Sequence, residues 1–265
     1  MVATDSSPKR SSITPTARPN SQDPKPLILQ SVDESDELHH KFIQQSHDAL
    51  AKVLETNNSE YSEDYEKIYE EKKEDHKLKI YLSSYMTPEK NRVNKVRAEW
   101  YVPVTPEQFI GFMNNVEEQW KVDDGTMEKF YPVSIMNAEE ESGYVVYYLS
   151  YKKQMVASAR DMIYIKHYKK LDDDTYADAS VSVEHPDFPE VKNYVRCEFK
   201  AGGNIIKLVS GKEDGKPVSF IRMSSESDFK TNVPLFMAKS FTNSSLKGYI
   251  ERCIKSLKTL HPHQA

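Results

Sequence analysis

Alternation of apolar with polar residues runs through most of this chain and constrains its fold more than any other feature. Ten short segments carry the pattern: 65–70, 78–82, 96–102, 128–136, 144–151, 162–170, 176–183, 194–199, 205–209 and 218–225. A period of two is typical of strands with one face buried. One sizeable helical segment interrupts these strands, whereas a doubly wound parallel sheet needs a crossover helix after nearly every strand. We therefore predict an α+β fold with a largely antiparallel sheet of about nine or ten strands.

Three helices are predicted around this sheet. Ser35 can cap an N-terminal helix, whose apolar stripe ends near Asn57. Thr105 can cap the second, which has proline as its first helical residue and reaches Trp120. The third spans about 234–260 and keeps one face apolar beside a face rich in lysine, arginine and glutamate. The chain is therefore expected to close with a long amphipathic helix that packs on the sheet.

Charge and cysteine content exclude several classes of function. The chain has 36 basic and 41 acidic side chains and a net charge of −5, whereas nucleic-acid surfaces depend on clustered lysine and arginine. Cys197 and Cys253 are far apart, so neither a disulfide framework nor a metal knuckle is indicated. No apolar run reaches the roughly 18 to 20 residues of a membrane-spanning helix. We expect a cytoplasmic monomer without cofactor, metal or nucleic-acid partner.

The N-terminal part of the chain differs in composition from the rest. Residues 1–33 are rich in serine, proline and threonine. Such a segment buries too little apolar surface to offset the entropy lost on ordering. We expect a disordered tail over residues 1–33 and one folded domain over residues 34–262.

Several short motifs occur in an order that resembles one known family. They are the strand Ser158–Lys166 with its Arg-Asp pair, the turn Glu184-His185-Pro186, the segment Tyr194–Glu198, the pair Gly202-Gly203, and Asp228-Phe229-Lys230 ahead of Pro234. This order is similar to that of the START (StAR-related lipid transfer) domains. The resemblance implies a helix-grip fold, in which a curved antiparallel sheet wraps round a long C-terminal helix. It also implies that the domain is a lipid carrier and not an enzyme.

The resemblance further implies an entrance to the lipid site. START domains hold one lipid inside the curved sheet, and their closing helix and the loop before the Arg-Asp strand form the gate. The corresponding segments here are residues 234–260 and 152–159. The residues predicted for the gate or for transient contact with a membrane surface are Met155, Val156, Phe236 and Met237.

The class of lipid depends on a few positions that the resemblance places inside the sheet. Tyr147 and Lys166 stand where sterol-binding members carry an acidic residue and an arginine. Leu149, Met162 and Lys200 stand where phosphatidylcholine-transfer members have an aromatic cage, and none of the three is aromatic. A desolvated lysine suits an anionic head group, whereas a lysine near the strand end would simply reach solvent. Both a phospholipid and a sterol remain open as ligands.

The residues predicted to contact the lipid are Tyr147, Leu149, Arg160, Met162, Tyr164, Lys166, Met223 and Phe241. Neighbours on a strand point to opposite faces, so Arg160 and Asp161 are not expected to pair with each other. We expect them to hold the entrance loop through hydrogen bonds to backbone, with direct lipid contact as the alternative.

Motifs for catalysis are missing from the sequence. It has no Gly-x-Ser-x-Gly, no His-Glu-x-x-His and no Cys-x-x-Cys. No helix is predicted after the segment Ala201–Asn204, so its glycines are not expected to form a phosphate site. We predict a hairpin turn there instead. Two alternatives to a carrier stay open. One is an enzyme that acts on a hydrophobic ligand with Tyr147, His167 or Arg160 as acid and base, and the other is a lipid-sensing interaction module.

Overall fold

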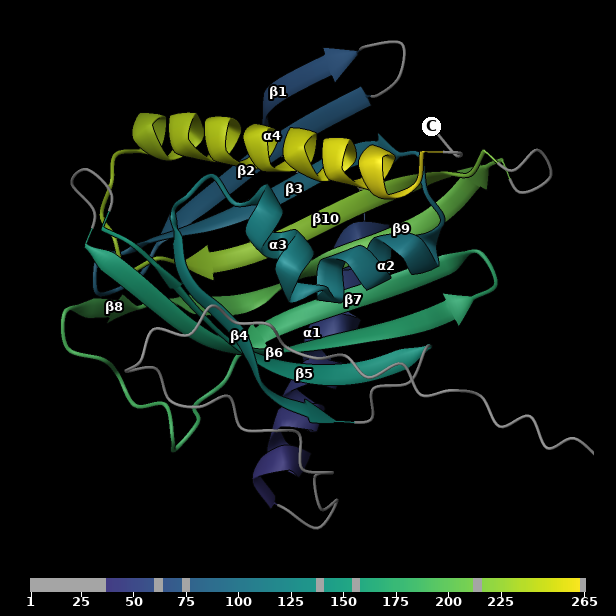
Figure 1. Ribbon diagram of the computed structural model, residues 1–265. Coiled ribbons are helices and arrows are strands. Elements are labelled where there is room, and N and C mark those ends of the chain that lie inside the picture. Colours follow the sequence, from purple (N-terminus) through teal and green to yellow (C-terminus); the bar gives the residue numbers. More distant parts are fainter. Residues whose placement is uncertain are drawn as a thin grey trace, which may run out of the picture.

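The computed structural model describes residues 37–59, 64–72, 77–136, 141–153, 158–211 and 216–262. Within them, ten strands form one sheet in the order β1-β2-β3-β10-β9-β7-β6-β5-β4, with β8 beside β6 (Figure 1). The pairing of β6 with β8 is parallel and the other pairings are antiparallel. The strands are β1 Glu66–Lys72, β2 Lys77–Met86, β3 Arg92–Val102, β4 Met127–Met136, β5 Ser142–Tyr151, β6 Ala159–Asp172, β7 Thr175–Ser182, β8 Tyr194–Arg196, β9 Glu198–Ser210 and β10 Val218–Asp228.

In the residues that the structure describes, four helices cover the two faces of this sheet. They are α1 Glu37–Asn58, α2 Pro106–Asn114, α3 Val116–Val122 and α4 Leu235–Leu260. Figure 1 shows α4 lying across β1, β2 and β3, with α2 and α3 beside it and α1 on the opposite side. We call the side that carries α2, α3 and α4 the inner face, and the side that carries α1 the outer face. The predicted combination of antiparallel sheet, N-terminal helix and closing helix is confirmed.

The inner face has an apolar core where α4 meets the sheet. Ile254 and Leu257 of α4 are buried in one cluster with Trp100 of β3, Ile206 of β9 and Ile221 of β10. Neighbouring strands place Trp100 opposite Ile221 and Ile221 opposite Ile206, so these side chains stand in one row across the sheet. Burying a side chain of this size contributes about 1.5 to 3 kcal/mol. This row fixes the C-terminal half of α4.

The outer face has a separate core under α1. Phe42 packs among Ile163 and Ile165 of β6, and Val53 packs against Ala177 and Ala179 of β7. The alanines leave room for the helix to approach the sheet closely. The predicted first helix is therefore present, although its proposed cap at Ser35 lies outside the described residues.

The single helix predicted from Thr105 to Trp120 is two helices. Thr105 caps α2 as expected, since its side chain accepts a hydrogen bond from the backbone of Gln108 and the Gln108 side chain bonds back to it. Asn115 then adopts an extended backbone, and its side chain accepts from two backbone N–H groups of α3. A side chain that competes for backbone donors ends one helix and begins the next.

The prediction of a hairpin turn at Ala201–Asn204 is wrong, because this segment lies inside β9. Gly203 pairs with Ala179 of β7, and a Cβ atom at Gly203 would lie 2.0 Å from the carbonyl oxygen of Asp178. Glycine is needed here because the backbones of β7 and β9 approach so closely. The glycine pair marks that approach and not a turn.

Candidate functional site

Six of the eight residues predicted to contact a lipid lie along the inner face. Tyr147 of β5 faces Tyr164 of β6, and Leu149 faces Met162 in the next pair along the same strands. These side chains form a cluster with Phe130 and Val116, which joins α3 to the sheet. The other two of the six are Lys166, farther along β6, and Met223 of β10.

Lys166 belongs to a buried polar cluster that the sequence reading did not foresee. Its Nζ atom is 3.7 Å from a carboxylate oxygen of Asp178 and donates to the carbonyl of Met113 at the end of α2, at 3.3 Å. Asp178 also accepts from the backbone and the side-chain amide of Asn204, at 3.0 Å each. We call Lys166, Asp178 and Asn204 the polar cluster. They come from β6, β7 and β9 and meet on the inner face.

Burial governs the charge of this cluster. Lys166 is 6 % exposed, so the alternative in which this lysine reaches solvent near the strand end is wrong. Desolvation lowers the pKa of its ammonium group, and the nearby carboxylate of Asp178 partly offsets that effect. Asp178 and Asn204 resemble solvent-facing residues of an alternating strand, so periodicity alone could not place them inside.

Tyrosine hydroxyls add further polar atoms beside the apolar side chains. Burial raises the pKa of Tyr147, Tyr164 and Tyr249 well above the usual range, and raises the pKa of Tyr151 to about 12. The four phenols are therefore neutral and can donate or accept at physiological pH. Tyr249 of α4 donates to the side chain of Gln119 in α3 at 3.0 Å, which links the closing helix to its neighbour.

Arg160 and Asp161 point to opposite sides of β6, as expected from their adjacency. Arg160 donates from Nε to the carbonyl of Phe229 at 3.2 Å and from Nη1 to that of Ser158 at 2.6 Å. It thereby joins the start of β6 to the segment that leads into α4. Both of these contacts of Arg160 are to backbone, whereas the carboxylate of Asp161 accepts from the side chains of Arg196 and Tyr148, so the role predicted for the pair does not hold for Asp161.

Asp161 is fully buried and holds a different loop. Arg196 of β8 donates to it from Nε at 3.0 Å and from Nη2 at 2.9 Å, and Tyr148 adds a hydrogen bond at 3.2 Å. The same guanidinium donates to the carbonyls of Phe188 and Pro189. The carboxylate of Asp161 therefore holds the loop between β7 and β8 through Arg196. The sequence did not predict this ion pair between Asp161 and Arg196.

The two halves of α4 are held unequally. Its buried residues are Ala238, Ile250, Cys253, Ile254 and Leu257, so four of the five lie in the last eleven positions. Phe236 is 71 % exposed and Phe241 is 44 % exposed, while Met237 is half-buried. Phe241, which was predicted to contact lipid, is thus largely open to solvent. Met155 and Val156, predicted for the gate, lie outside the described residues.

The residues proposed for an enzyme do not form one site. Tyr147 lies on the inner face, whereas His167 lies on the outer face between the rings of Tyr144 and His47. Arg160 is bound to backbone at the start of β6. Among the described residues, no group of three or more His, Cys, Asp and Glu side chains could hold a metal ion. Cys197 and Cys253 are buried free thiols.

An antiparallel sheet with a long C-terminal helix across its inner face defines the helix-grip class of fold. The family model of the START domain matches residues 51–264, so the chain belongs to the START domain family. In the described part of the chain, no helix is long and apolar enough to cross a membrane.

Solved structures with the same fold include several human proteins. Human StAR-related lipid transfer protein 5 matches with a TM-score of 0.65 and 17 % identity, over 84 % of this chain and 99 % of that one. Human STARD10 matches with a TM-score of 0.57 and 18 % identity, over 89 % of this chain and 91 % of that one. No curated protein sequence matches the chain. At these identities the structural matches establish the fold alone.

Proposed function

We propose that this domain binds one lipid between the inner face of the sheet and α4, and carries it from one membrane to another. The observation that carries the proposal is the inner face itself, where apolar side chains of β5 and β6 adjoin a buried polar cluster. An apolar surface with a few convergent polar groups is typical of a ligand site. The family membership supports the same reading.

The polar groups suit the head of an amphiphilic molecule. Lys166 and Asp178 together provide donors and acceptors, and neutral tyrosines lie on the same face. A lipid hydroxyl, phosphate or carboxylate that reached Lys166 would gain a hydrogen bond in a site of low dielectric constant. The ligand is either a phospholipid or a sterol, with its apolar part against the β5 and β6 cluster.

The N-terminal half of α4 is the proposed gate, together with residues 152–159. One buried side chain, Ala238, lies in its first fifteen positions, so opening this half would expose little apolar core. Phe236 and Met237 are proposed to enter the bilayer surface during exchange. The proposed carrier is a monomer that works in the cytoplasm and performs no chemistry on its ligand.

A vesicle assay tests the carrier directly. Transfer of fluorescent phosphatidylcholine, phosphatidylinositol and sterol would be followed between donor and acceptor vesicles. Met223→Trp adds bulk to the inner face and is expected to reduce transfer about tenfold or more, because overpacking displaces the ligand. Val209→Trp adds the same ring at an exposed position of β9 and should transfer at the wild-type rate. Wild-type transfer by both variants, or no transfer of any lipid by the native protein, would refute the proposal.

A further inference from the structure

The polar cluster on the inner face has its charges balanced within the protein. The carboxylate of Asp178 is 3.7 Å from Nζ of Lys166, and it accepts hydrogen bonds from the backbone and the side-chain amide of Asn204, at 3.0 Å each. Both ions are buried, with Lys166 6 % exposed and Asp178 2 % exposed. A ligand that reaches this site therefore meets an ion pair and not a free cation.

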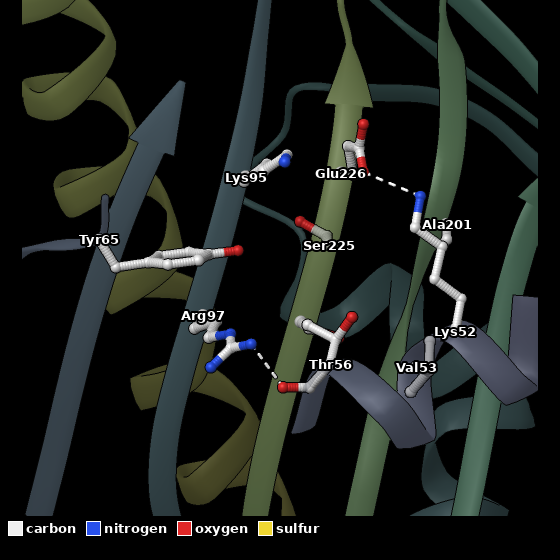
Figure 2. A pocket seen from close by; sticks show the side chains of 10 residues that line it. Lys52, Val53, Thr56, Tyr65, Lys95, Arg97, Ala201, Ser225 and Glu226 are labelled. Atoms are coloured by element: carbon white, nitrogen blue, oxygen red, sulfur yellow. Dashed lines mark hydrogen bonds and ion pairs between the residues drawn. The ribbon is translucent and has the colours of Figure 1, made fainter. Parts of the chain in front are cut away.

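Among the residues that the structure describes, no second buried lysine or arginine lies on the inner face. The buried side chains of these two types are Lys166 and Arg97. Arg97 lies on the outer face of β3, where it donates to the carbonyl of Thr56 near the end of α1 (Figure 2). Burial lowers the pKa of Lys166, so any loss of its proton would leave the pair with Asp178 negative. The buried pair is thus neutral or negative, but not positive.

The pair still has hydrogen-bonding positions for one uncharged group. An ammonium group has three donors, and Lys166 uses two of them, one on Asp178 and one on the carbonyl of Met113. A carboxylate has about four acceptor positions. Asp178 fills three of them, one with Lys166 and two with the N–H groups of Asn204. A hydroxyl group both donates and accepts, so it can bond to Asp178 and Lys166 together without adding charge.

An anionic head group meets a different balance of forces. Its attraction to Lys166 is opposed by repulsion from Asp178, because the two side chains are in contact. At an effective dielectric constant of about 20, two unit charges about 5 Å apart repel strongly enough to weaken binding more than a hundredfold. The anion also loses its hydration when it enters a buried site. Asp178 therefore cancels the affinity that Lys166 alone would give to a phosphate or a carboxylate.

We infer that the site selects an uncharged lipid with a hydroxyl head and rejects anionic lipids, and that Asp178 is the residue that sets this specificity. The inference rests on the proposed carrier function and narrows its ligand. Sterols and diacylglycerols have the required chemistry. Lys166 then serves as the partner of Asp178 and does not act as an anion site.

Two matched pairs of fluorescent lipids test the selectivity of the whole protein. Diacylglycerol and phosphatidic acid differ in one hydroxyl against one phosphate, and a sterol and its sulfate ester differ in one hydroxyl against one sulfate. Each lipid is placed at trace level in phosphatidylcholine vesicles, and its transfer to acceptor vesicles is compared with the rate without protein. In each pair that is transferred, the native protein should move the uncharged member at least about tenfold faster than the anionic one.

Substitutions in the ion pair assign the selectivity to Asp178. Asp178→Asn leaves Lys166 without its carboxylate and should raise transfer of the anionic member, relative to the uncharged one, about tenfold. Asp173→Asn removes the same charge from a side chain that is 94 % exposed, and it should keep the native ratio. The double variant Lys166→Met, Asp178→Asn has no cation at the site, so its anionic lipids should not gain. Urea unfolding establishes that each variant is folded.

A native preference for uncharged lipids that falls in Asp178→Asn, and not in the double variant, upholds the inference. Equal or faster transfer of the anionic lipids by the native protein overturns it, and this measurement does not depend on the folding of any variant. An unchanged ratio in folded Asp178→Asn, or an equal gain in the double variant, overturns the role of Asp178. Absence of transfer for all four lipids would instead refute the carrier function, and the inference with it.

Discussion

Acidification should loosen α1 from the sheet through His167. Its ring is buried between Tyr144, at a centroid distance of 4.4 Å, and His47, at 5.1 Å. Burial, with smaller contributions from the neighbouring His47 and Lys169, lowers the pKa of His167 from 6.5 to about 4. The folded state thus favours the neutral ring, and the unfolded chain binds the proton first as the pH falls. Stability is therefore lost between pH 6.5 and about pH 4.

The size of this loss follows from the two pKa values. At pH 5.5 the unfolded state gains about 1.4 kcal/mol from protonation, while the folded state gains almost nothing. Water near the edge of α1 screens part of this difference, so we expect about 1 kcal/mol. Below pH 4 both states are protonated and the contribution stops growing. Other groups titrate in the same range, so the prediction concerns a difference between variants.

Urea unfolding at pH 7.5 and at pH 5.5 measures this difference. His167→Phe keeps an aromatic ring between Tyr144 and His47 but cannot titrate, so it should lose about 1 kcal/mol less than the wild type on acidification. His40→Phe changes an exposed histidine of α1 and should behave like the wild type. An equal loss in the wild type and in His167→Phe would show that the buried ring is not the cause.

Three further predictions concern single side chains. Asp161→Asn leaves the guanidinium of Arg196 without its carboxylate and should lower the free energy of unfolding by about 3 kcal/mol, whereas the exposed Asp173→Asn should not. Gly203→Ala places a Cβ atom against the Asp178 carbonyl and should lower the free energy of unfolding by about 3 kcal/mol. Gly111→Ala, in open space on α2, should raise it by about 0.5 to 1 kcal/mol. Denaturant melts check both pairs, and the opposite order in either pair would contradict the contacts described. Phe236→Ser should slow vesicle transfer several-fold without changing lipid binding, whereas Val191→Ser, at another exposed apolar position, should leave transfer unchanged. Equal rates for both variants would show that Phe236 does not contact the membrane.

The strands and the closing helix could be predicted because their signals are local. A period of two over β5 and β6, and a continuous apolar stripe on α4, require no knowledge of distant residues. Periodicity left the inward side of β5 undecided, because Tyr147 and Tyr148 are equally aromatic. The resemblance placed Tyr147 inside, and the described structure has it there.

Contacts between distant strands could not be predicted in this way. Asp178 meets Lys166 and Asn204 only because β7 lies between β6 and β9, and an aspartate in an alternating strand usually faces water. The segment around Gly203 was predicted to be a turn because glycine occurs both in hairpin turns and where two backbones approach closely. Asn115 separates α2 from α3, although the apolar stripe predicted one continuous helix as far as Trp120.

Mass spectrometry of the native protein tests the central claim most directly. The protein would be purified from a membrane-containing extract, weighed intact under native conditions, and then extracted with organic solvent to identify what it held. The account predicts one lipid molecule per chain of a single class, lost in Met223→Trp and kept in Val209→Trp. A native mass equal to the bare chain, together with no lipid taken up from mixed vesicles, would contradict it.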